Sequence, residues 1–197
     1  MSRTIAVLVP SFSLALAHLA TGCADDIAHA SPDAGLPAGK VATTRNAADG
    51  TYTTVVDSTS MTDWIYADFE TGGEVLATAP WDLRFQRFHI STNGGASGGG
   101  GVEVAAIAGA SFAAVTAAPT SGFLADAADG NGDGMPDYAF EQGDGWYDYD
   151  PATHLLSPKP IVWAVKTDGG AMLKLEIVKY YDAAGTSGWF QLHWGPL

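Results

Sequence analysis

The chain has 197 residues, which is enough for one domain with a sizeable hydrophobic core. It carries 22 Asp and Glu residues against 9 Lys and Arg, for a formal net charge of −13. That charge argues against nucleic acid and anionic lipid headgroups as partners, because both would be repelled, and the single cysteine leaves no partner for an intramolecular disulfide.

Residues 1–22 are predicted to be a lipoprotein signal peptide. A basic residue, Arg3, precedes an apolar run from Ile5 to Leu19, and small residues then lead to Cys23. The run is too short for a membrane-spanning helix. Because a lone exported thiol has no disulfide partner, we interpret Cys23 as the lipid-modified first residue of the mature chain. An ordinary signal peptide followed by an incidental cysteine is the alternative.

Residues 23–50 are rich in Ala, Asp, Pro and Gly and show little apolar periodicity, so a flexible tether is predicted there. From Thr51 to Leu197 the composition is that of a single β domain. Short segments rich in β-branched and aromatic residues alternate with Gly, Pro, Asp and Asn in this part of the chain.

The clearest strand is Ala171–Tyr181, because Leu173, Leu175 and Ile177 share one face of an extended chain. The turn at 168–170 predicts a hairpin with the segment before it, and a further strand would complete a C-terminal meander. No helix longer than two turns is expected, so the fold class is all-β with mainly antiparallel sheets. The strand candidates are Thr51–Val56, Trp64–Phe69, Trp81–Ser91, Val102–Ile107, Ile161–Thr167, Ala171–Tyr181 and Gly188–Trp194.

A glycine-rich segment, residues 93–101, lies between two of these strands. Gly95, Ser97 and Gly99 match the letters of a hydrolase nucleophile elbow. That motif requires a helix after the serine, whereas the residues that follow, 102–104, have the pattern of a strand. A structural turn is therefore expected, and a serine hydrolase is disfavoured.

An acidic segment, residues 129–137, carries the most specific chemical motif. Asp129, Asn131, Asp133 and Asp137 occupy positions 1, 3, 5 and 9 of a calcium loop, and Gly134 occupies position 6. Alternating oxygen side chains on a tightly turned backbone point at one centre, and hard oxygen ligands suit Ca²⁺. The glutamate of an EF-hand is absent at position 12. A solvated turn of Asp, Asn and Gly is the alternative to a calcium site.

The order of the strands and their amino-acid sequences resemble those of the HmuY family of haem-binding lipoproteins. The segments that carry the resemblance are 81–87 (Trp-Asp-Leu-Arg-Phe-Gln-Arg), 92–95 (Thr-Asn-Gly-Gly), 145–149, 162–166 and 173–181. The resemblance implies a hand-shaped all-β fold, a lipid anchor on the outer membrane and capture of haem between projecting hairpins. It also implies a TonB-dependent outer-membrane receptor as partner and no enzymatic activity.

Family members hold haem iron with paired His or Met side chains from the central segment, and Met135 falls near one of those positions. No histidine matches the other position, to which Tyr147 or Tyr149 lies nearer than His154 does. From the residues alone, haem iron accepts His, Met or Tyr. The loop residue His154 and the aromatic residues before it are candidates, although they are equally consistent with the packed face of a hairpin. His89 is interpreted as a structural residue.

Two functions therefore remain open. The first is a surface-anchored haem-binding lipoprotein that captures haem for uptake. The alternative is a calcium-stabilised surface lipoprotein with the same fold and no haem binding. The acidic composition favours the alternative, because haem propionates usually contact Arg or Lys, and Arg84, Arg87 and Lys159 are the few candidates.

Overall fold

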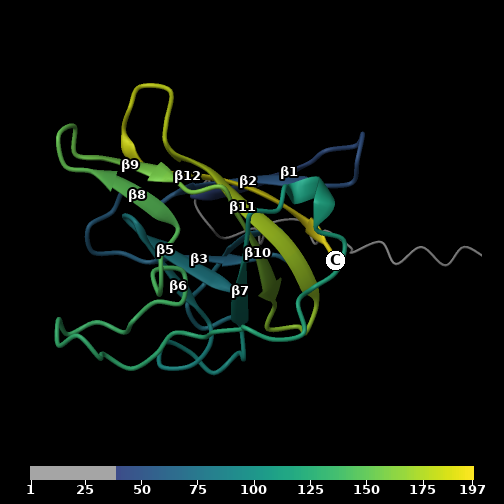
Figure 1. Cartoon of the computed structure of the whole chain (residues 1–197), viewed down its shortest axis with the longest axis horizontal. Helices are drawn as coiled ribbons and strands as arrows, with labels where there is room; N and C mark the ends of the chain where they lie inside the picture. The colour runs from purple at the N-terminus through teal and green to yellow at the C-terminus, as the bar shows by residue number, and fades with distance from the viewer. Residues whose placement is uncertain (1–38) are drawn as a thin grey trace, which may run out of the picture.

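A computed structural model describes residues 39–197 and is built almost entirely of strands (Figure 1). Its single helical element is a short 3₁₀ turn, η1. None of the helical segments in this range is long and apolar enough to cross a membrane. The elements are β1 (Val41–Arg45), β2 (Tyr52–Asp57), β3 (Ile65–Asp68), β4 (Gly73–Val75), β5 (Leu83–Gln86), β6 (His89–Thr92), β7 (Glu103–Ala108), η1 (Phe112–Ala114), β8 (Tyr147–Asp150), β9 (Leu155–Pro158), β10 (Ile161–Lys166), β11 (Met172–Tyr181) and β12 (Ser187–Pro196).

Ten of the strands form one antiparallel sheet in the order β6-β5-β3-β4-β1-β2-β12-β11-β10-β7, and β8 and β9 form a separate hairpin. The predicted C-terminal meander is confirmed, with Trp163 opposite Leu175 and Leu175 opposite Trp194. Strand β12 then pairs with β2, from the other end of the domain. The all-β fold class predicted from the sequence is therefore correct.

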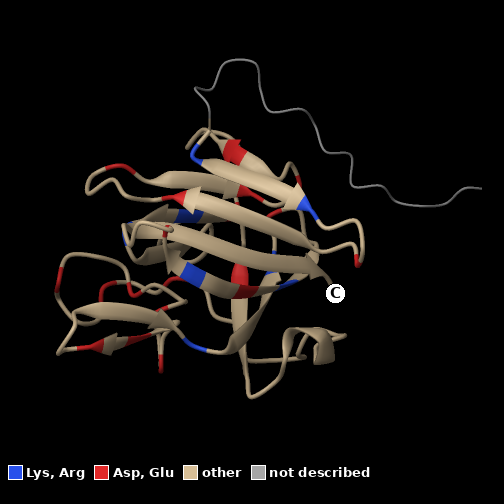
Figure 2. Ribbon diagram, turned by 90° about the horizontal axis from the view of Figure 1, so that it is seen from above, with Lys and Arg blue, Asp and Glu red and all other residues tan. Residues whose placement is uncertain are grey.

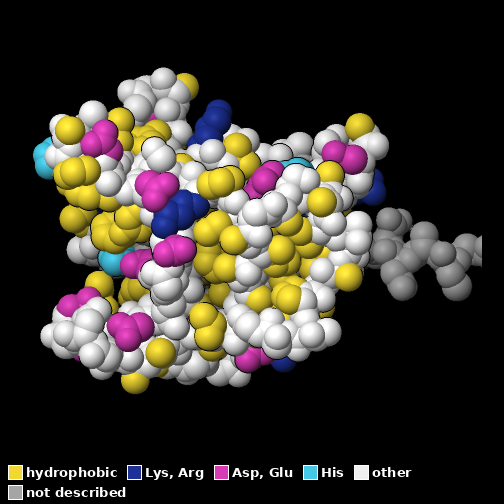
Figure 3. Space-filling view, in the orientation of Figure 1, with side chains coloured by type: hydrophobic (Ala, Val, Ile, Leu, Met, Phe, Trp, Pro, Cys, Tyr) yellow, Lys and Arg dark blue, Asp and Glu magenta, His cyan; other side chains and the backbone are white. Residues whose placement is uncertain are grey.

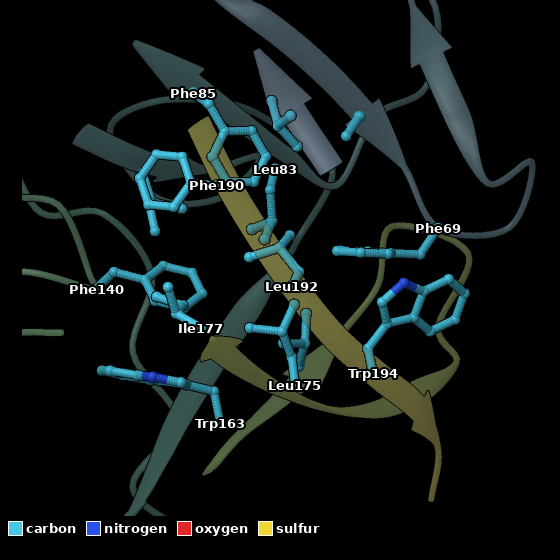
Figure 4. Close-up of a cluster of buried hydrophobic side chains, with 14 of the residues drawn as sticks. Phe69, Leu83, Phe85, Phe140, Trp163, Leu175, Ile177, Phe190, Leu192 and Trp194 are labelled. Carbon is cyan, nitrogen blue, oxygen red and sulfur yellow. The ribbon is translucent and has the colours of Figure 1, made fainter. Parts of the chain in front are cut away.

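The core is an aromatic and aliphatic layer on one face of the curled sheet (Figure 4). Side chains alternate between buried and partly exposed along β2 and β12, as the period of two in a strand requires. The Tyr52 ring stacks on Trp194 with 4.2 Å between centroids, and Phe85 contacts Phe190 at 5.3 Å. The buried indole nitrogen of Trp194 donates a hydrogen bond of 2.8 Å to Oγ1 of Thr54.

The structure corrects two sequence predictions. The tether predicted for residues 23–50 extends too far, because Val41–Arg45 forms β1 and pairs with β2 along its whole length. The strand predicted over Trp81–Ser91 is two strands, because Arg87 has a φ of 51° and turns the chain into the β5–β6 hairpin. That conformation is held by contacts of Arg87 itself, whose N–H donates to the Ser58 carbonyl at 2.8 Å and whose guanidinium donates to Oγ of Ser187 at 2.8 Å.

The short strand β4 and the β8–β9 hairpin are absent from the strand predictions. The signal peptide, Cys23 and residues 23–38 of the predicted tether lie outside the described residues.

The glycine-rich segment connects the two edges of the sheet, β6 and β7. A Cβ atom on Gly94 would lie 2.1 Å from the Val102 carbonyl oxygen, and one on Gly95 would lie 2.0 Å from that of Asp126. Gly95 also has a φ of 59°. These positions therefore accept only glycine, which supports the structural interpretation of the segment.

Candidate functional site

Two projections of the chain stand on the same side of the sheet (Figure 1). One is the β8–β9 hairpin, and the other is the long connection from β7 to β8, which contains the acidic segment 129–137. The molecular surface is hollowed between them (Figure 3). The long connection and the start of β6 form a cavity of about 470 Å³, within the usual range for small-molecule sites. Its walls are His89, Asn131, Asp133, Met135, Pro136, Asp137, Tyr138, Glu141, Gln142 and Gly143.

His89, the first residue of β6, lines this cavity with one side of its ring fixed. Its Nδ1 lies 3.0 Å from Oε1 of Glu141, and the two side chains are 16% and 24% exposed. Phe88 packs on the ring at 4.1 Å between centroids, and Tyr138 lies at 5.3 Å. Within residues 39–197 the bond to Glu141 is the ring's one hydrogen bond. When Nδ1 donates to the carboxylate, Nε2 keeps its lone pair, as in histidines that bind metals.

Met135 reaches the same cavity from the acidic segment. The base of that segment is closed by a bridge in which Ala127 and Asp137 exchange backbone hydrogen bonds of 2.9 and 3.1 Å. The Met135 N–H donates to Oδ1 of Asp133 at 2.8 Å, which fixes the backbone next to the cavity. The structure therefore places a predicted haem ligand, Met135, at the same cavity as a histidine that was expected to be structural.

The predicted calcium residues are only partly brought together. Asn131, Asp133 and Asp137 line the cavity, whereas Asp129 does not. The Asp129 carboxylate accepts the N–H groups of Gly132 and Gly134 at 2.6 and 2.9 Å, and these bonds lower its pKa. Among the described residues, the three carboxylates of the segment do not form a group with ligand atoms within 4.8 Å of one another. Calcium binding by this segment stays a prediction.

The other predicted haem ligands lie on the β8–β9 hairpin. Tyr147 is half-buried against Trp146 and Phe88, and its pKa is raised by burial first and by the negative charge of Glu141 second. Tyr147 is therefore next to the cavity. Tyr149 and His154 are exposed at the far end of the hairpin, where Oη of Tyr149 lies 2.5 Å from Nδ1 of His154. They contact each other and do not line the cavity.

A separate group of acids, which the sequence analysis did not predict, joins three segments of the sheet. Asp68, Glu70, Asp82 and Asp168 have ligand atoms that all lie within 4.8 Å of one another. Asp82 is completely buried and accepts the N–H groups of Phe69 and Asp168 at 2.7 and 2.9 Å. Burial, opposed by these bonds and reinforced by the charge of Glu70, raises the pKa of Asp82 to about 8. Burial therefore favours the protonated form of Asp82.

The charges near the cavity are mostly negative, since Asp133, Asp137 and Glu141 line it. Over the whole domain, most acidic residues lie in loops and at strand ends (Figure 2). The three basic residues considered for haem propionates have other contacts. Arg84 lies over the Trp64 ring at 4.4 Å, Arg87 bonds Ser187 at 2.8 Å, and Lys159 is 3.6 Å from Asp148.

Sequence reasoning missed His89 and Glu141 as site residues. The two are far apart in the chain, and their contact depends on the β5–β6 turn at Arg87, which the sequence analysis took as continuous strand. The one available signal was a histidine that directly follows an aromatic residue, Phe88.

Comparisons with known proteins agree with this architecture. A search of curated proteins found no match. Among solved structures, the chain is similar to a protein of Bacteroides fragilis described as a lipoprotein, with 22% identity, a TM-score of 0.55 and coverage of 76% of this chain and 90% of that one. It is also similar to a Bacteroides vulgatus protein described as an HmuY-like haem-binding protein, with 20% identity, a TM-score of 0.59 and coverage of 75% and 92%. The apo HmuY analogue of Tannerella forsythia is similar as well, with 18% identity and a TM-score of 0.52. That match covers 78% of this chain and 95% of the analogue.

At these identities the solved structures show the fold alone. The family comparison is independent of them, because the sequence model of the HmuY protein matches residues 60–194. The match covers β3 to β11 and most of β12, and it includes the cavity and both projections. The chain belongs to the HmuY family.

Proposed function

We propose that the protein is a haem-binding lipoprotein that captures haem at the cell surface for uptake and catalyses no reaction. The observation that carries the proposal is the cavity that contains both Met135 and His89. A thioether and an imidazole are two of the side chains that bind haem iron. Membership of the HmuY family and the fold shared with a protein described as HmuY-like and haem-binding support it.

The charge of the cavity sets how haem would enter it. Asp133, Asp137 and Glu141 repel the two propionates, so the porphyrin would enter by its apolar edge and leave the propionates in solvent. The aromatic ring of Tyr138, which lines the cavity next to His89, would contact the porphyrin.

The lipid anchor and the receptor complete the proposal. Acylation of Cys23 would hold the domain at the outer membrane, and a TonB-dependent receptor there would take over the haem. Replacement of Cys23 by Ser should move the protein from the membrane fraction to the soluble fraction and abolish labelling by a fatty acid. Unchanged fractionation would contradict the anchor.

The direct test of haem binding is a haemin titration of the purified mature protein, residues 23–197, followed in the Soret region. The proposal predicts a saturable shift with one haem per chain and a low-spin spectrum after reduction. A spectrum that stays that of free haemin at protein excess would contradict it.

A second candidate, a calcium-stabilised surface lipoprotein, is favoured by one observation. Three of the four predicted calcium residues, Asn131, Asp133 and Asp137, line the same cavity. Calcium bound only by the native state would raise the melting temperature, by an amount that corresponds to about 2.7 kcal/mol at a hundred times the Kd. The replacement of Asp133 by Asn should abolish that rise, and an unchanged melting curve with and without calcium would contradict this candidate.

A further inference from the structure

We propose that His89, held by Glu141, and Met135 are the two axial ligands of the captured haem iron. The inference rests on the proposed function and assigns its ligands. It departs from the sequence prediction in taking the histidine from the start of β6 rather than from the β8–β9 hairpin.

The first step of the argument is the orientation of the His89 ring. Glu141 accepts the proton on Nδ1 at 3.0 Å, so the tautomer with a free lone pair on Nε2 is favoured. A carboxylate on the far nitrogen is the usual support of a metal-bound imidazole, because it fixes the ring and increases its basicity. The rings of Phe88 and Tyr138 restrict its rotation further.

The second step is the elimination of the other candidates. A tyrosine binds haem iron as the deprotonated phenolate. Tyr138 lines the cavity and Tyr147 lies next to it, and burial raises the pKa of each. The acids around them oppose a second negative charge as well. His154 is exposed, and its Nδ1 contacts Tyr149 at the far end of the hairpin.

The third step is the neutrality of the pair. Imidazole and thioether bind iron without adding charge to a cavity that already contains Asp133, Asp137 and Glu141. Met135 projects from a segment whose base is closed at Ala127 and Asp137, so its backbone is held while its three-bond side chain adjusts to the iron.

The test is a set of haemin titrations with spectra of both oxidation states. The wild-type protein is expected to give a low-spin ferric spectrum with the near-infrared sulfur-to-iron band of His/Met ligation. His89→Gly is expected to lose the low-spin spectrum and to regain it with added imidazole. Met135→Ala is expected to lose the near-infrared band and to become high-spin, because the iron then has one protein ligand. His154→Ala is the matched control and is expected to keep the wild-type spectrum.

A second variant guards against a folding defect. His89→Met is expected to keep haem binding and to convert the spectrum to that of two thioether ligands, which a structural role of His89 would not produce. Glu141→Gln is expected to keep the ligands and to raise the midpoint potential, because the imidazole loses its anionic partner. Haem binding by the wild type with an unchanged low-spin spectrum in His89→Gly and His89→Met would overturn the ligand assignment and leave the proposed function standing. Absence of binding by the wild type would overturn both.

Discussion

The indole nitrogen of Trp146 donates a hydrogen bond to the backbone carbonyl of Phe88, with 3.1 Å between the two atoms. Trp146 is 1% exposed and immediately precedes β8, whereas Phe88 immediately precedes His89. The Lys159 N–H donates to the Trp146 carbonyl at 2.8 Å, so both strands of the β8–β9 hairpin are fixed at this point. One buried side chain thus sets the position of the hairpin relative to the cavity wall.

Replacement of Trp146 by Phe should therefore lower the free energy of unfolding by about 1–3 kcal/mol, because the partly buried Phe88 carbonyl loses its donor. Urea denaturation measures the loss. Trp189→Phe is the matched control, since the Trp189 side chain is partly exposed. Equal losses in the two variants would mean that the hydrogen bond to Phe88 contributes nothing specific.

The glycine-rich segment offers a comparison between two substitutions of the same kind. Gly94→Ala places a Cβ atom 2.1 Å from the Val102 carbonyl oxygen, whereas a Cβ atom on Gly99 meets nothing within 4 Å. Gly94→Ala should cost at least about 2 kcal/mol of stability because backbone must move, and Gly99→Ala should change it by less than about 0.5 kcal/mol. Thermal denaturation followed by circular dichroism distinguishes them. Similar melting temperatures would show that the segment adapts.

The stability of the domain should fall as the pH rises from about 5 to about 8. The pKa of Asp82 is raised to about 8 in the folded protein from an ordinary value of 3.8. In this interval the native state keeps a proton that the unfolded state has lost, so the free energy of unfolding decreases, by up to about 1.4 kcal/mol per pH unit for one such group. Burial also raises the pKa values of Glu70 and Asp168, and these groups act in the same direction.

Melting temperatures at pH 5 and pH 8 test this expectation. Asp82→Asn imitates the protonated acid and should flatten the dependence while it retains most of the stability at pH 5. Asp144→Asn, at an exposed position, should leave the dependence as in the wild type. A wild-type melting temperature that rises over this interval would contradict the prediction.

Haem binding should strengthen with added salt. Asp133, Asp137 and Glu141 repel the propionates, and salt screens that repulsion, with a Debye length of about 10 Å at 0.1 M. Haemin titrations at low and high ionic strength give the slope of affinity against salt. Asp133→Asn should bind haem more tightly than the wild type at low salt, and Asp182→Asn, on the β11–β12 turn, should not. Weaker binding at high salt would point to an attractive contact of the propionates with Arg or Lys.

The sequence predicted the fold well where burial and alternation agree. Leu173, Leu175 and Ile177 define β11 by their period of two, and the turn at residues 168–170 then determines the meander. The strands that were missed lack that signal. In β8 only Tyr147 is partly buried and the other three residues are exposed, and β1 buries only Val41.

The site was predictable only in part, for a related reason. Met135, which lines the cavity, was predicted because a family resemblance pointed to its segment. His89 and Glu141 come together through a turn in which Arg87 adopts a positive φ, stabilised by contacts with Ser58 and Ser187 that are distant in sequence. Nothing local distinguishes such a residue from one in mid-strand. The acids around Asp82 are missed for the same reason, since they come from three different parts of the chain.

The pairing of β2 with β12 has a consequence for how the protein is made. Tyr52 lies opposite Trp194 and Asp57 lies opposite Trp189. Strand β2, near the start of the domain, therefore cannot complete its pairing before β12, the last strand, is available. A chain that emerges N-terminus first, from a ribosome or an export channel, leaves one edge of β2 unpaired until the residues of β12 are released. Pairing between strands so distant in sequence is slow to form, because the entropy cost of closing a long loop comes before any stabilising contact between them. Until β12 arrives, that edge of β2 exposes unpaired backbone N–H and C=O groups, which are groups that a strand of another chain can bind.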